Sequence, residues 1–185
     1  KRLNQRLQKA HKQREVNRYS RKKSRNKLVA LVGYTNAGKS LLFNKLTKKN
    51  ELSKNKLFQT LDTKISKIYL PERKISGLID TVGFINNIPT QLIESFQATL
   101  EELHSADFLI NVVDINDINY KNKIIITKKI LKETGISEKK ISMMMTVYNK
   151  IDLNKFTYEN TNNKNYVSAL TGEGIDELKL NMSVQ

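Results

Sequence analysis

The residues best suited to chemistry form a glycine-bounded loop between an apolar run at 28–32 and a helix-like segment at 41–46. The loop reads Gly33, Tyr34, Thr35, Asn36, Ala37, Gly38, Lys39 and Ser40, and Leu41 follows it. Glycines near both ends let the backbone point successive N–H groups into one concavity, where phosphate oxygens bind beside a helix N-terminus. Lys39 would add positive charge near the β- and γ-phosphates, and the Ser40 hydroxyl can ligate Mg²⁺. The spacing therefore predicts a phosphate-binding P-loop.

A second motif follows the predicted strand at 75–79. It consists of Asp80, Thr81, Val82 and Gly83. Asp80 can hold Mg²⁺ through water, and the Gly83 backbone N–H can bind a γ-phosphate. An Asp-x-x-Gly turn is common by itself, but its place after a P-loop indicates a nucleotide site.

A third motif ends the apolar run at 143–148 and is predicted to read the base. It consists of Asn149, Lys150, Ile151 and Asp152. The Asp152 carboxylate can accept hydrogen bonds from N1–H and N2–H₂ of guanine, whereas adenine offers neither donor and would leave the carboxylate unpaired. Asn149 can either tie this loop to the P-loop or contact the base, and the Lys150 stem can cover the ring. The competing interpretation is a strand-to-helix turn with Asp152 as an N-cap.

A short loop after the predicted strand at 166–167 supports guanine recognition. It consists of Ser168, Ala169 and Leu170. A backbone N–H of this loop would reach the guanine carbonyl oxygen. Guanine would then be recognised by two contacts, one with Asp152 and one with this loop.

The polar stretch at 48–57 predicts a loop that closes on the γ-phosphate. The residues that follow it are Phe58, Gln59, Thr60, Leu61 and Asp62. We predict Thr60 as the second Mg²⁺ ligand, with Thr63 as its competitor. Loops of this kind order when GTP binds and relax after hydrolysis. The candidate metal ligands are Ser40, Thr60 and Asp80, and the candidate catalytic residues are Lys39, Thr60 and Gly83.

Strands alternate with helices along the chain, a pattern typical of an α/β sheet with its site at the carboxyl ends of the strands. The predicted strands are 28–32, 65–70, 75–79, 108–114, 143–148 and 166–167, and the predicted helices are 41–46, 89–103, 121–132 and 174–180. The turn at 71–74 predicts a hairpin in an otherwise parallel sheet. We expect Ile124, Ile125 and Leu131 to face inward, and the methionines at 143–145 to fill the core.

Positive charge is concentrated at the start of the chain. Residues 1–27 hold twelve of the 33 lysines and arginines but one of the 18 acids, a net charge of +11 against +4 for the remainder. We predict a basic helical linker over 1–26 and a nucleotide-binding domain over 27–185. The linker would contact RNA phosphates, or it is a solvated remnant of a preceding domain; both can hold.

Length and composition restrict the class of protein. A chain of 185 residues without cysteine suits one domain without disulfides or thiolate metal sites. No apolar run reaches membrane-spanning length. The chain begins at Lys1, so we expect a fragment, monomeric and cytoplasmic, or organellar if an upstream targeting segment was removed.

Four stretches, in this order, resemble the GTPase domain of the HflX family, and the resemblance covers about residues 20–180. They are Gly33–Ser40, Phe58–Asp62, Asp80–Ile85 and Ala98–Glu102. The resemblance implies a P-loop NTPase three-layer sandwich of the small-GTPase type, binding and hydrolysis of GTP to GDP, and Mg²⁺ dependence. It further implies binding to the large ribosomal subunit and its rRNA, with Lys1–Asn26 as the end of a basic linker that follows a separate domain.

Several positions depart from the family pattern or bear on mechanism. Leu41 replaces the usual Thr, and Thr63-Lys64 replaces a Pro-Thr.

Phe84 occupies the position where many small GTPases orient the attacking water with glutamine, so we expect slow hydrolysis or a group recruited from elsewhere; a GTP/GDP sensor with negligible hydrolysis is the alternative. Asn36 matches a position that ligates K⁺ in related GTPases, unless it only stabilises the turn. A related GTPase of ribosome assembly or tRNA modification is a further alternative.

Overall fold

The computed structural model describes residues 27–48, 64–71, 75–84, 102–153 and 164–184. Three predictions lie outside these residues. They are the basic helix over 1–26, the loop that contains Thr60 and most of the helix over 89–103. No described helix is long and apolar enough to cross a membrane.

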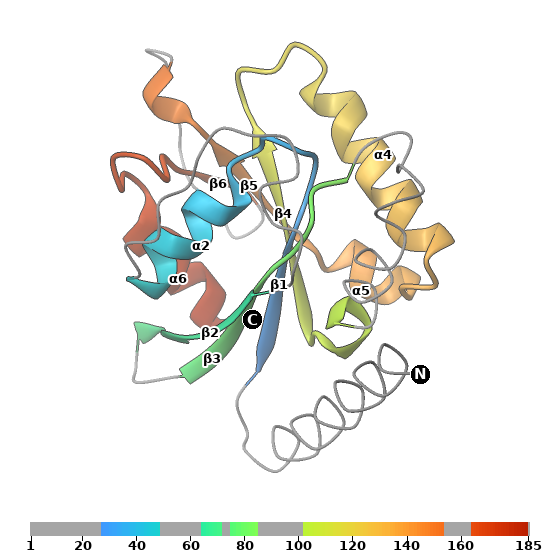
Figure 1. Ribbon diagram of the computed structural model, residues 1–185, viewed down its shortest axis with the longest axis horizontal. Coiled ribbons are helices and arrows are strands. Elements are labelled where there is room, and N and C mark those ends of the chain that lie inside the picture. The colour runs from blue at the N-terminus through green and yellow to red at the C-terminus, as the bar shows by residue number, and fades with distance from the viewer. Residues whose placement is uncertain (1–26, 49–63, 72–74, 85–101, 154–163, 185) are drawn as a thin grey trace, which may run out of the picture.

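A six-stranded sheet in the order β2-β3-β1-β4-β5-β6 forms the centre of the molecule (Figure 1). The strands are β1 (Leu28–Val32), β2 (Lys64–Tyr69), β3 (Ile75–Asp80), β4 (Phe108–Asp114), β5 (Met145–Asn149) and β6 (Lys164–Tyr166). Among the strands in the described residues, only β2 runs antiparallel to its neighbour, β3, and the other neighbouring pairs are parallel. The predicted mostly parallel sheet with one antiparallel strand is confirmed.

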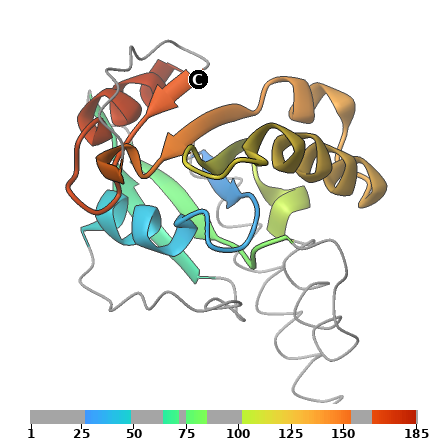
Figure 2. The ribbon, with the colours of Figure 1, turned by 90° about the horizontal axis from the view of Figure 1, so that it is seen from above.

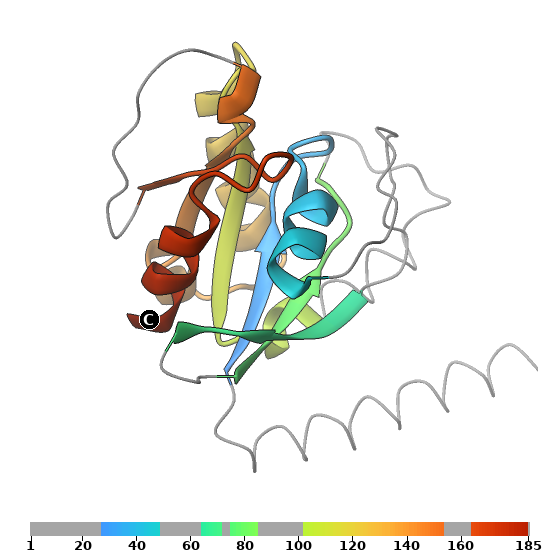
Figure 3. The ribbon, with the colours of Figure 1, turned by 90° about the vertical axis from the view of Figure 1, so that its left-hand side faces the viewer.

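Helices cover both faces of the sheet. They are α2 (Lys39–Thr47), α4 (Tyr120–Glu133), α5 (Glu138–Ser142) and α6 (Ile175–Val184), and a 3-10 turn, η3, spans Ile151–Leu153. Figure 3 shows α2 and α6 in front of the sheet, on the face opposite α4 and α5. The α/β sheet predicted from alternating strands and helices is therefore present, with the three layers that the family resemblance implied.

Two hydrophobic clusters, one on each face, explain why the central strands β1 and β4 are almost entirely apolar. All five residues of β1 are buried, and alternate ones face opposite clusters. Leu31 packs with Phe43 of α2 and Leu178 of α6, whereas Ala30 packs with Leu131 of α4. A strand buried on both faces has no polar side to alternate with its apolar side.

Helix α4 corrects one expectation about the core. Leu131 is fully buried and Ile124 is half-buried, but Ile125 is 64% exposed. Ile124 and Leu131 are seven residues apart and share a stripe with Thr127, whereas Ile125 lies about 100° further round the helix. The prediction that Ile125 faces inward was wrong.

The segment before β5 corrects a second expectation. Helix α5 was not predicted, and it begins at a side-chain cap, in which the Ser137 hydroxyl accepts a hydrogen bond from the Lys140 N–H. As a result β5 starts only at Met145, which is buried, while Met143 is 55% exposed. Of the methionines expected in the core, Met143 is therefore outside it.

Parallel pairing brings the carboxyl ends of four strands to one edge. Leu31 of β1 lies opposite Asp80 of β3, and Asp114 of β4 lies opposite Asn149 of β5. Figure 2 views the sheet from this edge. Every predicted nucleotide-binding motif within the described residues follows a strand here.

Candidate functional site

The P-loop has the backbone conformation that its glycines make possible. Gly33 and Gly38 have φ angles of 138° and 91°, and Asn36 between them has φ of 61°. A Cβ atom at Gly33 would lie 2.3 Å from the Val112 carbonyl oxygen, so no other residue fits against β4 here. The predicted turn between β1 and α2 is therefore present.

Lys39, the first residue of α2, is buried within the P-loop. Its ammonium donates hydrogen bonds to the carbonyl oxygens of Gly33, at 3.0 Å, and Tyr34, at 2.8 Å. Burial lowers the pKa of Lys39 to about 8, although the nearby Asp80 carboxylate acts in the opposite direction. The cation is thus present near neutral pH but easily deprotonated above it.

The Asp80–Gly83 motif lies beside this lysine. Asp80 ends β3 and is 1% exposed, and the Thr81 hydroxyl donates to the Leu31 carbonyl oxygen at 2.6 Å. A Cβ atom at Gly83 would lie 2.8 Å from the Thr35 Cα and 2.9 Å from the Lys39 Nζ. The glycine therefore lets the motif approach the P-loop closely. Val82 is buried.

Phe84 pairs with the P-loop through its backbone while its ring is fully buried in the core. The Phe84 N–H donates to the Gly33 carbonyl oxygen, and the Thr35 N–H donates to the Phe84 carbonyl oxygen, both at 3.0 Å. The ring points into the core cluster on the α4 face, so this position supplies no group for orienting water.

Asn149 joins the two predicted halves of the site. Its Nδ2 donates to the Ala37 carbonyl oxygen at 3.0 Å, and its Oδ1 accepts from the Ala169 N–H at 2.9 Å. A Cβ atom at Gly38 would lie 2.2 Å from Asn149 Nδ2, so the contact requires glycine there. Of the two roles considered for Asn149, the structure shows the tie to the P-loop.

Lys150 is held at the rim by its neighbours. It has a positive φ of 70°, and its ammonium lies 2.7 Å from Asp114 Oδ2. The Asn116 side-chain amide donates to the Lys150 carbonyl oxygen at 2.8 Å. These contacts fix the direction of the Lys150 stem.

Asp152 and the loop after β6 are linked by Ser168. The buried Ser168 hydroxyl donates to Asp152 Oδ1 and accepts from the Thr171 N–H at 3.0 Å. Asp152 itself is exposed, as is Leu170, whereas Ile151 beside Asp152 is buried. An exposed carboxylate held by a buried hydroxyl can accept donors from outside the protein.

The structure therefore brings the P-loop, the Asp80–Gly83 motif, Asn149–Asp152 and Ser168–Leu170 to one edge. The members of the predicted site that lie outside the described residues are Phe58, Gln59, Thr60, Leu61 and Asp62. Among described residues, no three His, Cys, Asp or Glu side chains cluster as a metal site. Ser40 and Asp80 supply two oxygen groups, a set that suits Mg²⁺ because this ion keeps several waters and takes phosphate oxygens as further ligands.

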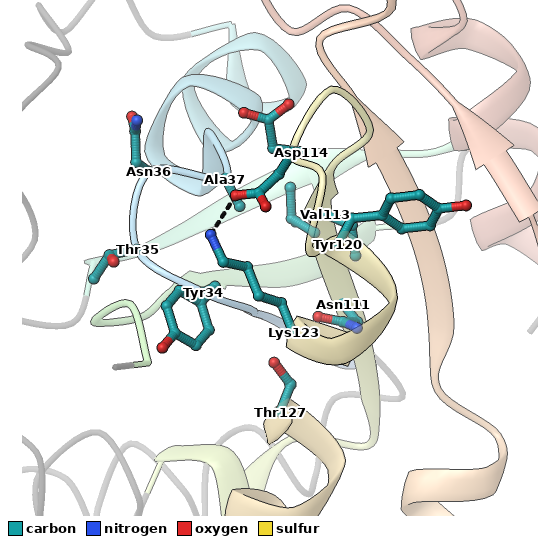
Figure 4. Close-up of a pocket in the computed structure, with 12 residues that line it drawn as sticks. Tyr34, Thr35, Asn36, Ala37, Asn111, Val113, Asp114, Tyr120, Lys123 and Thr127 are labelled. Carbon is teal, nitrogen blue, oxygen red and sulfur yellow. Dashed lines mark hydrogen bonds and ion pairs between the residues drawn. The ribbon is translucent and has the colours of Figure 1, made fainter. Parts of the chain in front are cut away.

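A polar cluster beside the P-loop was not predicted from the sequence. Lys123 of α4 pairs with Asp117, and its ammonium lies 4.8 Å from the centre of the Tyr34 ring (Figure 4). Asn111, in the otherwise apolar strand β4, is 1% exposed. Together with Tyr34, Asp117 and Lys123, it lines a cavity between β4, α4 and the P-loop. The asparagine amide in an otherwise apolar strand could have indicated this polar cluster from the sequence.

Known proteins resemble this chain in sequence and in fold. Residues 28–150 match the family model described as 50S ribosome-binding GTPase. GTPase HflX of Caldanaerobacter subterraneus subsp. tengcongensis is 40% identical over 176 residues, which cover 95% of this chain and 40% of that protein. GTPase HflX of Escherichia coli is 38% identical over 183 residues, covering 95% of this chain and 42% of that protein.

A solved structure supports the same assignment. It is a GTP-binding protein from the hyperthermophilic archaeon Sulfolobus solfataricus in complex with GDP, with a TM-score of 0.66 and 26% identity, covering 98% of this chain and 57% of that chain. The chain spans about two fifths of the length of these two curated relatives (40% and 42%). It belongs to the 50S ribosome-binding GTPase family, and the predicted resemblance to HflX GTPases is confirmed.

Proposed function

We propose that this chain binds GTP across the edge of the sheet and hydrolyses it to GDP and phosphate. The observation that carries the proposal is the double hydrogen bond of Asn149, which fixes the predicted base-reading loop to the P-loop. Lys39 and Asp80 interact on the phosphate side of the same edge. One extended ligand with a base at one end and phosphates at the other suits this arrangement.

Guanine would be recognised by Asp152. Its Oδ1 already accepts from Ser168, which orients the carboxylate, and guanine would add N1–H and N2–H₂ as donors. The Ala169 N–H is engaged by Asn149, so a contact from this loop to the guanine carbonyl oxygen requires a shared hydrogen bond or the neighbouring Leu170 N–H. The Lys150 stem, held by Asp114, would lie over the base.

The phosphates would be bound by P-loop N–H groups and Lys39. To reach them, the Lys39 ammonium exchanges the Gly33 and Tyr34 carbonyl oxygens for phosphate oxygens, which are stronger acceptors because they are charged. The Gly83 N–H would bind the γ-phosphate, and the fixed N–H groups would stabilise charge that develops during attack by water.

The Ser40 hydroxyl and the Asp80 carboxylate would hold Mg²⁺, with Thr60 as the proposed further ligand. The ion would neutralise charge on the β- and γ-phosphates. Asn36 is exposed at the rim of the P-loop, and its side-chain oxygen could ligate K⁺ beside the phosphates. Faster hydrolysis in K⁺ than in Na⁺ at equal ionic strength is expected, and Asn36→Ala should remove the difference. Equal rates in both salts would exclude this role.

Hydrolysis by the chain alone should be slow. The ring at position 84 is buried in the core and cannot position water, so a partner or another group would have to do so. The family assignment points to the large ribosomal subunit as that partner. Residues 1–26, with their excess of positive charge, would contact rRNA phosphates, and residues 27–185 would form the GTPase domain, acting in the cytoplasm as a monomer.

Two assays test this proposal. Calorimetry with GTP, GDP and ATP should show Mg²⁺-dependent binding of the guanine nucleotides only. Single-turnover hydrolysis, with and without 50S subunits, should show stimulation by the subunits. A chain that binds ATP as tightly as GTP would contradict the proposal; guanine binding without stimulated hydrolysis would leave the GTP/GDP sensor as the function.

A further inference from the structure

A cavity lies on the outer side of the P-loop, between the end of β4 and helix α4. It has a volume of about 70 Å³. Figure 4 shows Tyr34, Asn111, Lys123 and Thr127 around the same space. The residues assigned to phosphate and base, Lys39 and Asp152, do not line it. The cavity therefore shares a wall with the proposed nucleotide site, formed by the P-loop residues 34–37, and extends from this wall toward β4 and α4.

Asn111 is the feature of this cavity that calls for a ligand. It is 1% exposed, and neither its Oδ1 nor its Nδ2 makes a hydrogen bond with any group in the described part of the chain. Leaving a buried polar atom unsatisfied costs about 1–3 kcal/mol, and native structures contain few such atoms. The two atoms of one amide offer an acceptor next to a donor. A ligand that pairs with Asn111 would carry the complementary donor and acceptor side by side.

The charges of the cavity are already balanced. Asp114 pairs with Lys150 at 2.7 Å, and Asp117 pairs with Lys123. Asp117 also accepts a hydrogen bond from the Asn119 N–H at 2.8 Å. Since neither carboxylate requires a cation from outside, the cavity favours a neutral ligand over an ion.

The remaining walls favour a small planar molecule. The Tyr34 ring lies at one side of the space with the Lys123 ammonium 4.8 Å from its centre, and the fully buried Thr127 lies at another. Aromatic pairs pack in offset-stacked or edge-to-face arrangements, so a planar aromatic ligand can pack favourably beside the Tyr34 ring. An asparagine amide pairs with the donor and acceptor edge of a heterocycle, as it does with adenine in nucleic-acid recognition.

We propose that this cavity is a second ligand site, which binds a small neutral heterocycle through an amide-type edge paired with Asn111. Because Tyr34 and Thr35 belong both to the cavity wall and to the P-loop, a bound molecule would contact the loop that holds the phosphates. The site does not depend on the proposed hydrolysis.

Nicotinamide and nicotinate form a matched pair of probes. Both have the same ring, but only nicotinamide is neutral and carries a donor beside an acceptor. In ¹H–¹⁵N spectra of the whole chain, nicotinamide should shift the Asn111 side-chain amide signals saturably, with or without excess GDP. Nicotinate should not. Asn111→Leu should weaken nicotinamide binding about tenfold or more, the loss expected for two hydrogen bonds, while leaving GDP affinity unchanged.

A second variant, Thr127→Leu, fills the cavity without changing Asn111 and should also abolish binding, which keeps the test decisive if Asn111→Leu does not fold. Three outcomes would overturn the proposal. They are no saturable shift, which would mean that the cavity holds only water; equal binding of nicotinate; and displacement of nicotinamide by GDP, which would place it in the nucleotide site.

Discussion

The two ends of the proposed nucleotide site differ in which groups their internal hydrogen bonds use. At the base end, Asn149 bonds to Ala37 and Ala169, and Ser168 holds Asp152. At the phosphate end, Lys39 bonds to the P-loop's own carbonyl oxygens, and Phe84 pairs its backbone with the same loop. At the base end, the internal hydrogen bonds hold the side chains in position for a ligand. At the phosphate end, the Lys39 ammonium is bonded to backbone carbonyl oxygens that a phosphate would have to replace.

The difference separates selectivity from switching. A rigid base-reading end loses little conformational freedom on binding, so its hydrogen bonds can discriminate between bases. A phosphate end that must exchange internal contacts for ligand contacts has two alternative arrangements, and a phosphate can shift the balance between them. If the proposed function is right, the site joins a base-recognition end with fixed hydrogen bonds to a phosphate end whose hydrogen bonds change on binding.

Replacement of Lys39 should have the largest effect, because it removes a buried cation at the phosphate end. Lys39→Met should slow hydrolysis by about 100- to 1,000-fold, the range found on removing one stabilising group from a transition state. Measured preference for guanine over adenine should persist, since the base end is built without Lys39. Loss of that preference would mean that the two ends do not form independently.

A methyl group at Gly38 should break the link between the two ends. In Gly38→Ala the new Cβ would lie 2.2 Å from Asn149 Nδ2, at a φ of 91°. We expect a loss of about 2–4 kcal/mol in the free energy of unfolding, from backbone strain and a lost buried hydrogen bond, and weakened GDP binding, measured by denaturation and calorimetry.

Gly135→Ala is the matched control for this variant. Gly135 also has a positive φ, 82°, but its Cβ would be 3.5 Å from the nearest atom, His104 Cε1. The control should lose only about 1 kcal/mol in the free energy of unfolding, from backbone strain at a positive φ, and it should bind GDP normally. Equal losses in both variants would show that the Asn149 link contributes nothing.

The proton equilibrium of Lys39 gives a smaller effect. Its pKa is about 8 in the folded chain against 10.5 ordinarily, so the unfolded chain binds more protons between these values. Stability of the nucleotide-free chain should therefore gain a contribution from Lys39 as pH rises from about 8 to 10.5. Below pH 8 the lysine is charged in both states, and this contribution is constant.

Phosphate binding should reverse this shift, because the charged lysine then has anionic partners. GDP binding at pH 8 should take up about half a proton, since half of the free lysine is neutral at its pKa. Calorimetry in buffers of different ionisation enthalpy measures this uptake, and Lys39→Met should abolish it. An uptake that persists in the variant would assign the proton to another group.

Much of the fold and site could be predicted because both depend on local patterns. The residues of β1 are apolar throughout and those of β4 are apolar except for Asn111 and the terminal Asp114. The motifs that follow strands need only parallel pairing to meet at one edge. What could not be predicted depends on three-dimensional contacts. The choice between two roles for Asn149 is decided by the proximity of Ala37, 112 residues away in sequence.

Other features also required the tertiary structure. The exposure of Ile125 follows from how α4 is rotated against the sheet, and a run of three isoleucines at 124–126 leaves that rotation ambiguous. Likewise, the burial of Phe84 depends on the backbone pairing between two loops. The contact of Lys123 with Tyr34 joins two elements that no periodicity relates.

The most direct test exchanges the base preference at Asp152. Calorimetry should compare GTP, GDP, ATP and XTP on the unchanged chain and on Asp152→Asn. The amide introduced at position 152 can donate to the second carbonyl of xanthine, but it cannot accept both guanine donors. GTP affinity should therefore fall about tenfold or more, and XTP should bind in its place. Unchanged preference for GTP in the variant would contradict the assignment of this edge as a guanine nucleotide site read by Asp152.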